Sequence, residues 1–572
     1  MRLILSSIIL CLSALVHAQQ EQPNFVIVVV DDMGWSDTQP FGGEINTPNI
    51  ASLAEQGVVM TDFYVAPTCS PTRSALLTGV DHHSAGLGTM AKMQAPNQVG
   101  IKGYQAELTD DVVTLAEVLQ QQGYATMMTG KWHLALGTEQ MPERRGFQQS
   151  FILKEGAASH FGDKLKAHQS ATVNYFENGK PVDIPEDFYS TIHYTDKAIE
   201  YIKSADDSPF LAYIAYTAPH DPLQVPDAWL DRYKGKYDQG PEAIRQQRLQ
   251  RQQAAGLIPK DIKLWQIPLQ PEWLPSYKPA WGERSQQQRQ QDVRAMEIYA
   301  SMIEIVDQQI GRLLSSLEQQ GKLDNTYVLF FSDNGASGAT PLMYPKTSRQ
   351  WFLTERDHSP ANAGRPGSHV YMGNEWATAS GTPWKLYKGS VAEGGIRSPF
   401  IVRGPGLPQG QRSRSLAHVM DIAPTLYKLI GVEVEDNALF ADKQQPHGQS
   451  LLPFWRDTRK QEERTLAFEL FGNRAVRSGR WKGHKLQPPL GSGKWELYDI
   501  VKDPAATVEL SEQHPEILQG IIQAYDSYAQ MNHVVPPVPQ LAPNIADIYI
   551  GECNWWCEAK YFVVQKVLEF RK

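Results

Sequence analysis

Four oxygen-bearing side chains stand in two pairs that are far apart in the chain, Asp31-Asp32 and Asp333-Asn334. Three carboxylates and an amide carbonyl form an all-oxygen set, which suits a hard divalent cation such as Ca²⁺ or Mg²⁺. Adjacent acids at a strand end also cap helices, and that interpretation would be preferred for Asp31-Asp32 alone. Together with the run "SDNG", the metal interpretation is preferred.

Five further side chains could act beside such a cation: Arg73, Lys131, Lys388, His133 and His220. Singly, each lysine or arginine is an ordinary surface charge or ion pair. Beside a metal, they would neutralise a tetrahedral oxyanion as its charge redistributes. Histidine transfers protons near neutral pH, and two histidines that both follow predicted strands favour acid–base chemistry over a structural function.

Cys69 lies in the run "PTCSPTRSALLTG". Ser70 and Pro71 predict a helix start, with a capping hydroxyl followed by a proline ring in the first turn. Arg73 would then lie one turn from the sulfur, where an anion would also meet free backbone amides. A tyrosine-phosphatase-like thiolate would need its arginine six residues later, whereas Arg73 comes after four, so that function is excluded.

The elements that must position these residues are short apolar runs that alternate with helices. The predicted strands are Phe25–Val30, Ala125–Met128, Phe210–Tyr216, Tyr327–Phe331 and Phe400–Val402. The predicted helices include residues 48–57, 111–123 and 294–320. This alternation predicts an α/β fold with a mainly parallel central sheet sandwiched by helices.

The candidate residues follow the predicted strands directly. Asp31-Asp32, Lys131 with His133, His220, and Asp333-Asn334 come after four different strands. Open α/β sheets bind ligands outside the carboxyl ends of their strands. We therefore expect these residues to meet at one edge of the sheet.

The second half of the chain contains an insert and, after it, a change in the predicted secondary structure. Two glutamine-rich pieces flank a Trp/Pro-rich segment, residues 264–282, which we interpret either as an excursion over the active site or as solvated helical spacers. After about Arg456, antiparallel-looking runs and a helix near residues 515–529 predict a smaller C-terminal α+β subdomain. The predicted units are residues 1–18, 22–455 and 456–572.

The first 18 residues, "MRLILSSIILCLSALVHA", are typical of a signal peptide cleaved after Ala18, which predicts a periplasmic or secreted protein. Their apolar run is too short to span a bilayer, and we expect no transmembrane anchor. The net charge of −9 argues against nucleic acid as a partner. Cys553 and Cys557 favour a short disulfide over two free thiols, which leaves Cys69 without a partner.

Two motifs, "CSPTRSALLTG" and "GYATMMTGKWHL", resemble the signatures of the sulfatase family within the alkaline-phosphatase-like superfamily. The resemblance continues through "VDDMGWSD", "TAPHDPLQVP", "FSDNG" and "YKGSVAEGGIRSP", and it covers nearly the whole mature chain. The run "LLTGVDHHSAGLGTM" is most similar to bacterial arylsulfatases.

The resemblance implies that Cys69 is converted to 3-oxoalanine (formylglycine) by a formylglycine-generating or radical maturation enzyme. The hydrated aldehyde would attack sulfur and then release sulfate by elimination. One Ca²⁺ per chain, or Mg²⁺ in its place, would be bound by the modified Cys69 together with Asp31, Asp32, Asp333 and Asn334.

The same resemblance implies individual functions for the other side chains. Arg73 would steady the formylglycine hydroxyls, and Asp333 would accept the proton of the attacking hydroxyl. Lys131 and Lys388 would bind sulfate oxygens, with Lys385 a less favoured rival of Lys388. His133 would serve the elimination step, and His220 would protonate or stabilise the leaving oxygen.

The expected reaction is hydrolysis of a sulfate ester, in which an aryl sulfate and water give a phenol and inorganic sulfate. Alternatives are a phosphonate or phosphate ester hydrolase that uses the same formylglycine, a sulfatase acting on sulfated carbohydrate, and a non-catalytic binder in which Cys69 stays a thiol. We expect aromatic residues of the insert and of residues 348–376 to roof the pocket, against either aryl groups or sugar rings.

Overall fold

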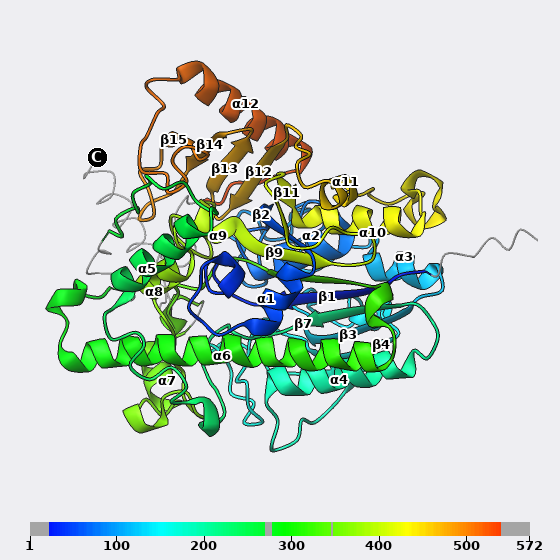
Figure 1. Ribbon diagram of the computed structural model, residues 1–572, viewed down its shortest axis with the longest axis horizontal. Helices are drawn as coiled ribbons and strands as arrows, with labels where there is room; N and C mark the ends of the chain where they lie inside the picture. The colour runs from blue at the N-terminus through cyan, green and yellow to red at the C-terminus, as the bar shows by residue number, and fades with distance from the viewer. Residues whose placement is uncertain (1–21, 269–276, 345–346, 539–572) are drawn as a thin grey trace, which may run out of the picture.

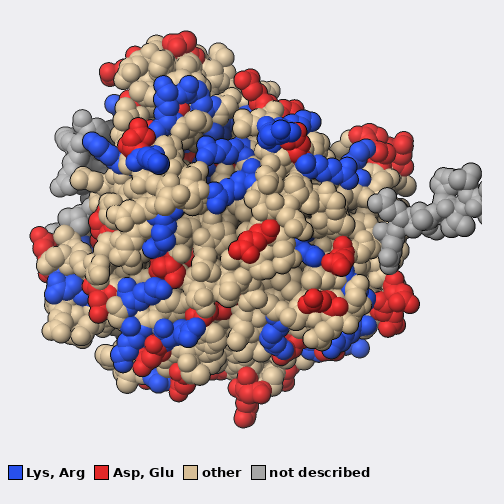
Figure 2. Space-filling model, viewed as in Figure 1, with Lys and Arg blue, Asp and Glu red and all other residues tan. Residues whose placement is uncertain are grey.

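A computed structural model describes residues 22–268, 277–344 and 347–538. The predicted signal peptide and the Cys553–Cys557 pair lie outside the described residues. Within them, no helix combines the length and the apolar character that crossing a membrane requires. Figure 2 shows acidic and basic side chains interspersed over the visible face.

An eleven-stranded sheet forms the centre of the described chain, in the order β10-β2-β9-β8-β1-β7-β3-β4-β5-β6, with β11 paired to β2. Strand β1 is parallel to β7 and β8, and β3 is parallel to β7. The main exception is β9, which is antiparallel to both neighbours. The strands are β1 (Asn24–Val30), β2 (Val58–Tyr64), β3 (Ala125–Lys131), β4 (Gln149–Leu153), β5 (Tyr175–Glu177), β6 (Lys180–Pro181), β7 (Phe210–Ala215), β8 (Thr326–Ser332), β9 (Arg397–Arg403), β10 (Gln411–Ser413) and β11 (Ala417–His418).

Helices cover both faces of this sheet, which explains why β1 is apolar at every position (Figure 1). Val26, Val28 and Val30 enter one core, which contains residues of α1 (Pro48–Glu55), α4 (Ser190–Ser204) and α6 (Gln286–Gln319). The alternate residues, Phe25 to Val29, enter a second core with α2 (Cys69–Thr78), α3 (Leu115–Gln121) and α10 (Ile422–Ile430). The predicted three-layer α/β fold is confirmed.

A separate four-stranded antiparallel sheet follows in the C-terminal part of the chain. Its strands are β12 (Thr465–Leu470), β13 (Asn473–Ser478), β14 (Trp481–Lys485) and β15 (Trp495–Asp499), and α12 (Pro515–Met531) packs on it. The antiparallel sheet and the terminal helix were predicted. The predicted boundary at residues 455 and 456 stays a prediction.

Two helices begin at other residues than predicted because of their caps. Helix α3 begins at Leu115 rather than near 111, since Thr114 and Glu117 form a reciprocal capping box. Helix α6 begins at Gln286 rather than 294, since Ser285 and Gln288 form the same motif. The second glutamine-rich piece is therefore the first part of α6.

The first glutamine-rich piece is α5 (Pro241–Ala254), and it is not a solvated spacer. Arg248 is fully buried and donates to Asp37 Oδ1 at 2.6 Å and to Glu44 Oε1 at 2.6 Å. Buried charge pairs of this kind fix the position of the helix on the domain. The remaining helices are α7 (Arg349–Thr354), α8 (Asn374–Ser380), α9 (Glu393–Ile396) and α11 (Leu452–Arg456).

Candidate active site

Four neighbouring parallel strands, in the order β8-β1-β7-β3, deliver the predicted residues to one edge of the sheet, as expected. Asp31-Asp32 follow β1, and Asp333-Asn334 follow β8. Lys131 is the last residue of β3, and His220 follows β7. Asp32 has a φ of 67°, a left-handed conformation that turns the chain directly after β1.

Cys69 is the first residue of α2, which presents it to this edge. The N-cap is Thr68, whose side chain makes no capping bond, so the predicted cap at Ser70 is wrong. The helix begins earlier because Thr68 already has an extended backbone, and this brings the thiol to the mouth of the helix. Cys69 Sγ donates to Asp31 Oδ1 at 3.3 Å and lies 4.0 Å from Asp32 Oδ1.

Three basic side chains pair with the three carboxylates. Lys131 Nζ donates to Asp31 Oδ2 at 2.6 Å, and Lys388 Nζ lies 2.7 Å from Asp32 Oδ1. Arg73, one turn after Cys69, donates to Asp333 Oδ2 from Nε at 3.0 Å and from Nη2 at 2.7 Å. Lys385 lies elsewhere, with Nζ 5.6 Å from the ring centre of Trp265.

The oxygen-rich cluster fits a hard cation. Ligand atoms of Asp31, Asp32, Cys69 and His220 lie within 4.8 Å of one another, all of them buried. Asn334 donates through Nδ2 to Asp32 Oδ1 at 2.7 Å, while its carbonyl oxygen is buried without a hydrogen-bond partner among the described residues. An orphaned buried acceptor beside carboxylates is what a metal ligand would leave behind.

The charges of the site shift its pKa values in different directions. Burial opposes ionisation of Asp31, but Lys131, His220 and Arg73 outweigh it and hold the pKa of Asp31 far below its usual range. Burial and the nearby charge of Asp31 raise the pKa of Asp333 to about 6, although Arg73 opposes this. Burial and Asp31 also raise the pKa of the Cys69 thiol to about 12.

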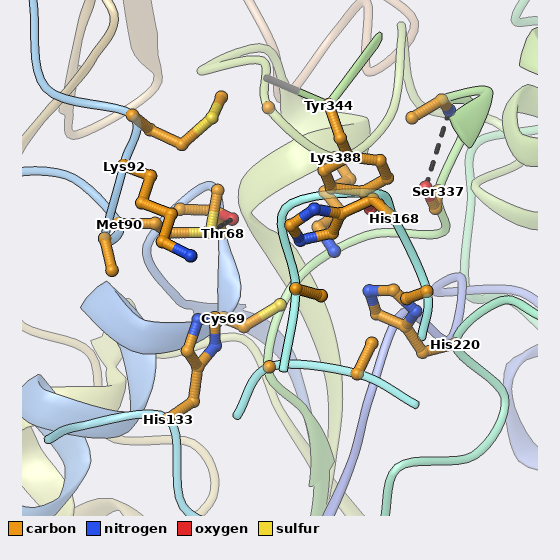
Figure 3. A pocket seen from close by; sticks show the side chains of 18 of the residues that line it. Thr68, Cys69, Met90, Lys92, His133, His168, His220, Ser337, Tyr344 and Lys388 are labelled. Atoms are coloured by element: carbon orange, nitrogen blue, oxygen red, sulfur yellow. Dashed lines mark hydrogen bonds between the residues drawn. The ribbon is translucent and has the colours of Figure 1, made fainter. Parts of the chain in front are cut away.

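The two histidines lie on either side of Cys69 (Figure 3). His220 Nδ1 lies 2.6 Å from the carbonyl oxygen of Asp221, which fixes Nδ1 as the protonated nitrogen and leaves Nε2 3.6 Å from Asp32 Oδ2. His133 is held differently: its Nδ1 has no partner among the described residues. Burial and the charge of Lys131 lower the pKa of His133 well below its usual value, so its ring is neutral.

A cavity of about 350 Å³ opens onto these groups. Cys69, Lys131, His133, His220 and Lys388 line it, and Figure 3 shows several of them converging on it. The rest of the wall is largely apolar and comes from distant segments of the chain: Met90, Met93, Leu136, Met343, Tyr344, Phe471, Pro489 and Leu490.

For the described residues, the predicted aromatic roof is wrong in its location. Among the described residues, neither the Trp/Pro-rich insert nor residues 348–376 line the cavity. The insert packs on the domain instead: Trp281 makes an edge contact with the buried Trp376, with ring centres 6.2 Å apart. The aromatic lining comes from Tyr344, Tyr387 and Phe471.

Sequence reasoning also missed Tyr213, whose hydroxyl accepts from Arg73 Nη1 at 3.4 Å. A tyrosine inside the apolar run "FLAYIAY" was the signal, because a buried phenol needs a polar partner. No local signal marked Phe471, which follows β12 on a turn of the C-terminal sheet.

Comparison with known proteins agrees with this geometry. The family model described as "Sulfatase" matches residues 23–432. The chain belongs to the sulfatase family. It is 38% identical to an uncharacterised sulfatase of Schizosaccharomyces pombe, with 92% of this chain and 97% of the relative covered. It is 40% identical to an arylsulfatase of Klebsiella aerogenes, with 73% of this chain and 88% of the relative covered.

Solved structures share the fold at lower identity. The structure of Ps i-CgsB in complex with k-i-k-neocarrahexaose aligns with a TM-score of 0.63 at 23% identity and covers 89% of this chain and 93% of that one. The phosphonate monoester hydrolase of Agrobacterium radiobacter aligns with a TM-score of 0.56 at 19% identity and covers 89% of this chain and 96% of that one. This sulfatase-family protein is therefore a hydrolase of sulfate esters built on a widely shared fold.

Proposed function

We propose that this sulfatase hydrolyses aryl sulfates, giving a phenol and inorganic sulfate. The observation that carries the proposal is the position of Cys69, which lines a cavity together with the charged groups of the site and with many apolar side chains. The charged groups suit a sulfate, and the apolar side chains suit an aromatic leaving group. The 40% identity to an arylsulfatase supports the same substrate class.

The reactive group in this proposal is Cys69 after conversion to formylglycine by a maturation enzyme, which supplies a hydroxyl nucleophile to the site. Ca²⁺, or Mg²⁺ in its place, would be held by Asp31, Asp32, Asp333 and Asn334 together with residue 69, and when bound it supplies positive charge beside the sulfate. Arg73 holds Asp333 Oδ2 through two nitrogens, which orients this carboxylate to accept the proton of the nucleophile.

Lys131 and Lys388 bind the sulfate oxygens in this proposal. Their ammonium groups now pair with Asp31 and Asp32, and they line the cavity next to Cys69. Preorganised cations at this position stabilise charge as it moves onto the departing groups.

The histidines handle protons on the two sides of the nucleophile. Since Nδ1 of His220 donates to the carbonyl of Asp221, Nε2 is the nitrogen left to donate to the leaving phenol oxygen, and this step uses the ring with a proton on both nitrogens. The neutral ring of His133 accepts the proton that is lost when sulfate is released, and Nδ1, which has no hydrogen-bond partner in the described part of the chain, is available for it.

We further propose that the chain is exported to the periplasm or secreted after cleavage behind Ala18. One peptide tests export and maturation together, because residues 19–73 contain no lysine or arginine before Arg73. Trypsin should release Gln19–Arg73 from protein made in its native host, with sulfur replaced by oxygen and two hydrogens lost at Cys69. An intact thiol, in a host with the maturation enzyme, would refute the formylglycine mechanism.

The substrate is tested on the matured protein with 4-nitrophenyl sulfate against an aryl phosphonate at equal concentration. Faster hydrolysis of the sulfate supports the proposal, whereas a preference for the phosphonate would reassign the enzyme to phosphonate esters. Activity confined to sulfated oligosaccharides would reassign it to carbohydrate.

A further inference from the structure

The C-terminal sheet reaches the cavity through the turn that joins β12 to β13. Leu470 pairs with Asn473, so Phe471 and Gly472 form a two-residue hairpin turn, with φ values of 55° and 80°. Such turns favour Asn or Gly at the first position because the left-handed region is strained for bulky residues. A phenylalanine held there points to a function for its side chain.

The ring of Phe471 belongs to the cavity wall. It is 8% exposed and forms a buried cluster with Leu470 and Met93, against which Met90 packs. Phe471, Met90 and Met93 all line the cavity. Met90 in turn accepts a hydrogen bond at Sδ from Thr68, 3.2 Å away, which is the residue directly before Cys69.

Glu469 anchors this turn from within β12. Its Oε1 accepts from the backbone N–H of Gly472 at 2.7 Å, and its Oε2 lies 3.0 Å from His83 Nε2. Both carboxylate oxygens are therefore engaged, one by the turn and one by the catalytic domain. Glu469 is buried, with 1% of its surface exposed.

His83 lies between two carboxylates. Its Nδ1 lies 3.1 Å from Asp81 Oδ1, so both ring nitrogens face carboxylates, and both must donate. Burial would lower the pKa of His83, but the bonds to Asp81 and Glu469 outweigh it and raise the pKa to about 9. His83 follows closely after α2, the helix that carries Cys69.

We propose that Phe471 sets the size of the group that the cavity accepts, and that His83 is the positioning residue that holds the Phe471 turn through Glu469. Residue 69, which becomes the nucleophile, and His83, which contacts Glu469, lie at the two ends of one short segment of the chain. The contacts of His83 with Glu469, and of Glu469 with Gly472, link this segment to the Phe471 turn. The proposal rests on the proposed function in taking the group beyond the sulfate to be apolar.

The test compares a one-ring substrate, 4-nitrophenyl sulfate, with a two-ring substrate, 4-methylumbelliferyl sulfate. Phe471→Gly removes the ring and suits the left-handed backbone, which offsets part of the cost of losing a buried side chain. It should raise the ratio of kcat/KM for the larger over the smaller substrate by about tenfold, mainly through KM. His83→Gln should shift the ratio in the same direction, and the double variant should equal Phe471→Gly alone, because no ring is left to position.

Leu497→Ala is the matched control, since Leu497 is fully buried in the same sheet but does not line the cavity. It should lower the melting temperature without changing the ratio. If His83→Gln does not fold, Glu469→Gln takes its place. A ratio that is unchanged in Phe471→Gly in both turnover and binding, or shifts of the ratio that simply add in the double variant, would overturn the proposal.

Calorimetry on Cys69→Ala proteins separates this test from the proposed function. The dissociation constants of the two aryl sulfates report the shape of the cavity without turnover. A shift in the ratio of the two dissociation constants in Phe471→Gly supports the assignment of Phe471 as the size-determining residue, even if the matured enzyme hydrolyses neither ester. A constant ratio in both binding and turnover refutes it.

Discussion

Removing the proton from His83 is expected to destabilise the fold by an amount that the structure allows us to work out. The group is enclosed by titratable neighbours: Asp81 and His82 on its own segment, Glu469 on β12, Tyr528 on α12 at 3.2 Å from Nδ1, and Tyr104 across the ring. Burial and the charge of His83 lower the pKa of His82 to about 4, so His82 stays neutral above that pH. Between pH 6.5 and 9, His83 is therefore the member of this group that titrates.

The magnitude follows from the difference in pKa between the two states. The pKa of His83 is about 9 in the folded protein and 6.5 for the free side chain. Because each unit corresponds to about 1.36 kcal/mol, the proton contributes on the order of 3 kcal/mol to stability. A raised folded-state pKa means that this contribution is complete below pH 6.5 and is lost as the pH rises toward 9.

The measurement is the free energy of unfolding in urea for the wild type and for His83→Gln, from pH 6 to 9.5. The difference between them should shrink by about 2 to 3 kcal/mol across this range, while groups common to both proteins cancel. Leu497, fully buried on β15 of the same sheet, offers a control without a titratable side chain: Leu497→Ala should give a difference from the wild type that stays constant over this range. A constant difference for His83→Gln would refute the charged histidine.

Three further predictions concern the active site. A Cβ at Gly156 would come within 2.6 Å of the ring of His133 and would displace it. Gly156→Ala should therefore lower kcat at least about tenfold with little change in the free energy of unfolding. An unchanged kcat would mean that the position of this ring does not affect catalysis. Lys388→Met should lower kcat/KM about 100-fold or more, whereas Lys385→Met should leave it within about twofold, and equal losses would contradict the assignment. Adding EGTA should lower the melting temperature of the wild type, and adding calcium should restore it. The melting temperature of Asn334→Leu should not respond to either addition. If this variant responds as the wild type does, Asn334 is excluded as a metal ligand.

The sequence predicted the site best for residues that lie at or directly after the end of a buried strand. Strand β1 is apolar at every position because both of its faces are covered, and this alone indicates a central strand. Asp31, Lys131, His220 and Asp333 each lie at or just after the end of a parallel strand, so the fold brings them together with no further information. Helix boundaries were less predictable, because a capping box such as Thr114–Glu117 competes with apolar periodicity over a few residues.

The cavity wall could not be predicted in this way. Met90, Tyr344, Phe471 and Leu490 are separated by long stretches of chain, and none lies in a repeating pattern with another. Their meeting depends on how the four-stranded C-terminal sheet lies against the segments around the larger sheet, and no single stretch of sequence determines this. The aromatic residues of the insert were predicted to cover the cavity, but the ring of Trp281 packs against Trp376 instead.

This division has a chemical consequence for the site. The charged half of the cavity is set by strand ends of one sheet, where a displacement would disturb several pairs such as Lys131–Asp31 and Arg73–Asp333 at once. One part of the apolar wall is formed by the Phe471 turn, which depends on Glu469 and on the packing of Phe471 against Met93. Substitutions in the turn can therefore change the accepted leaving group without displacing the groups that act on sulfate, and this separation is what the ratio of the two aryl sulfates measures.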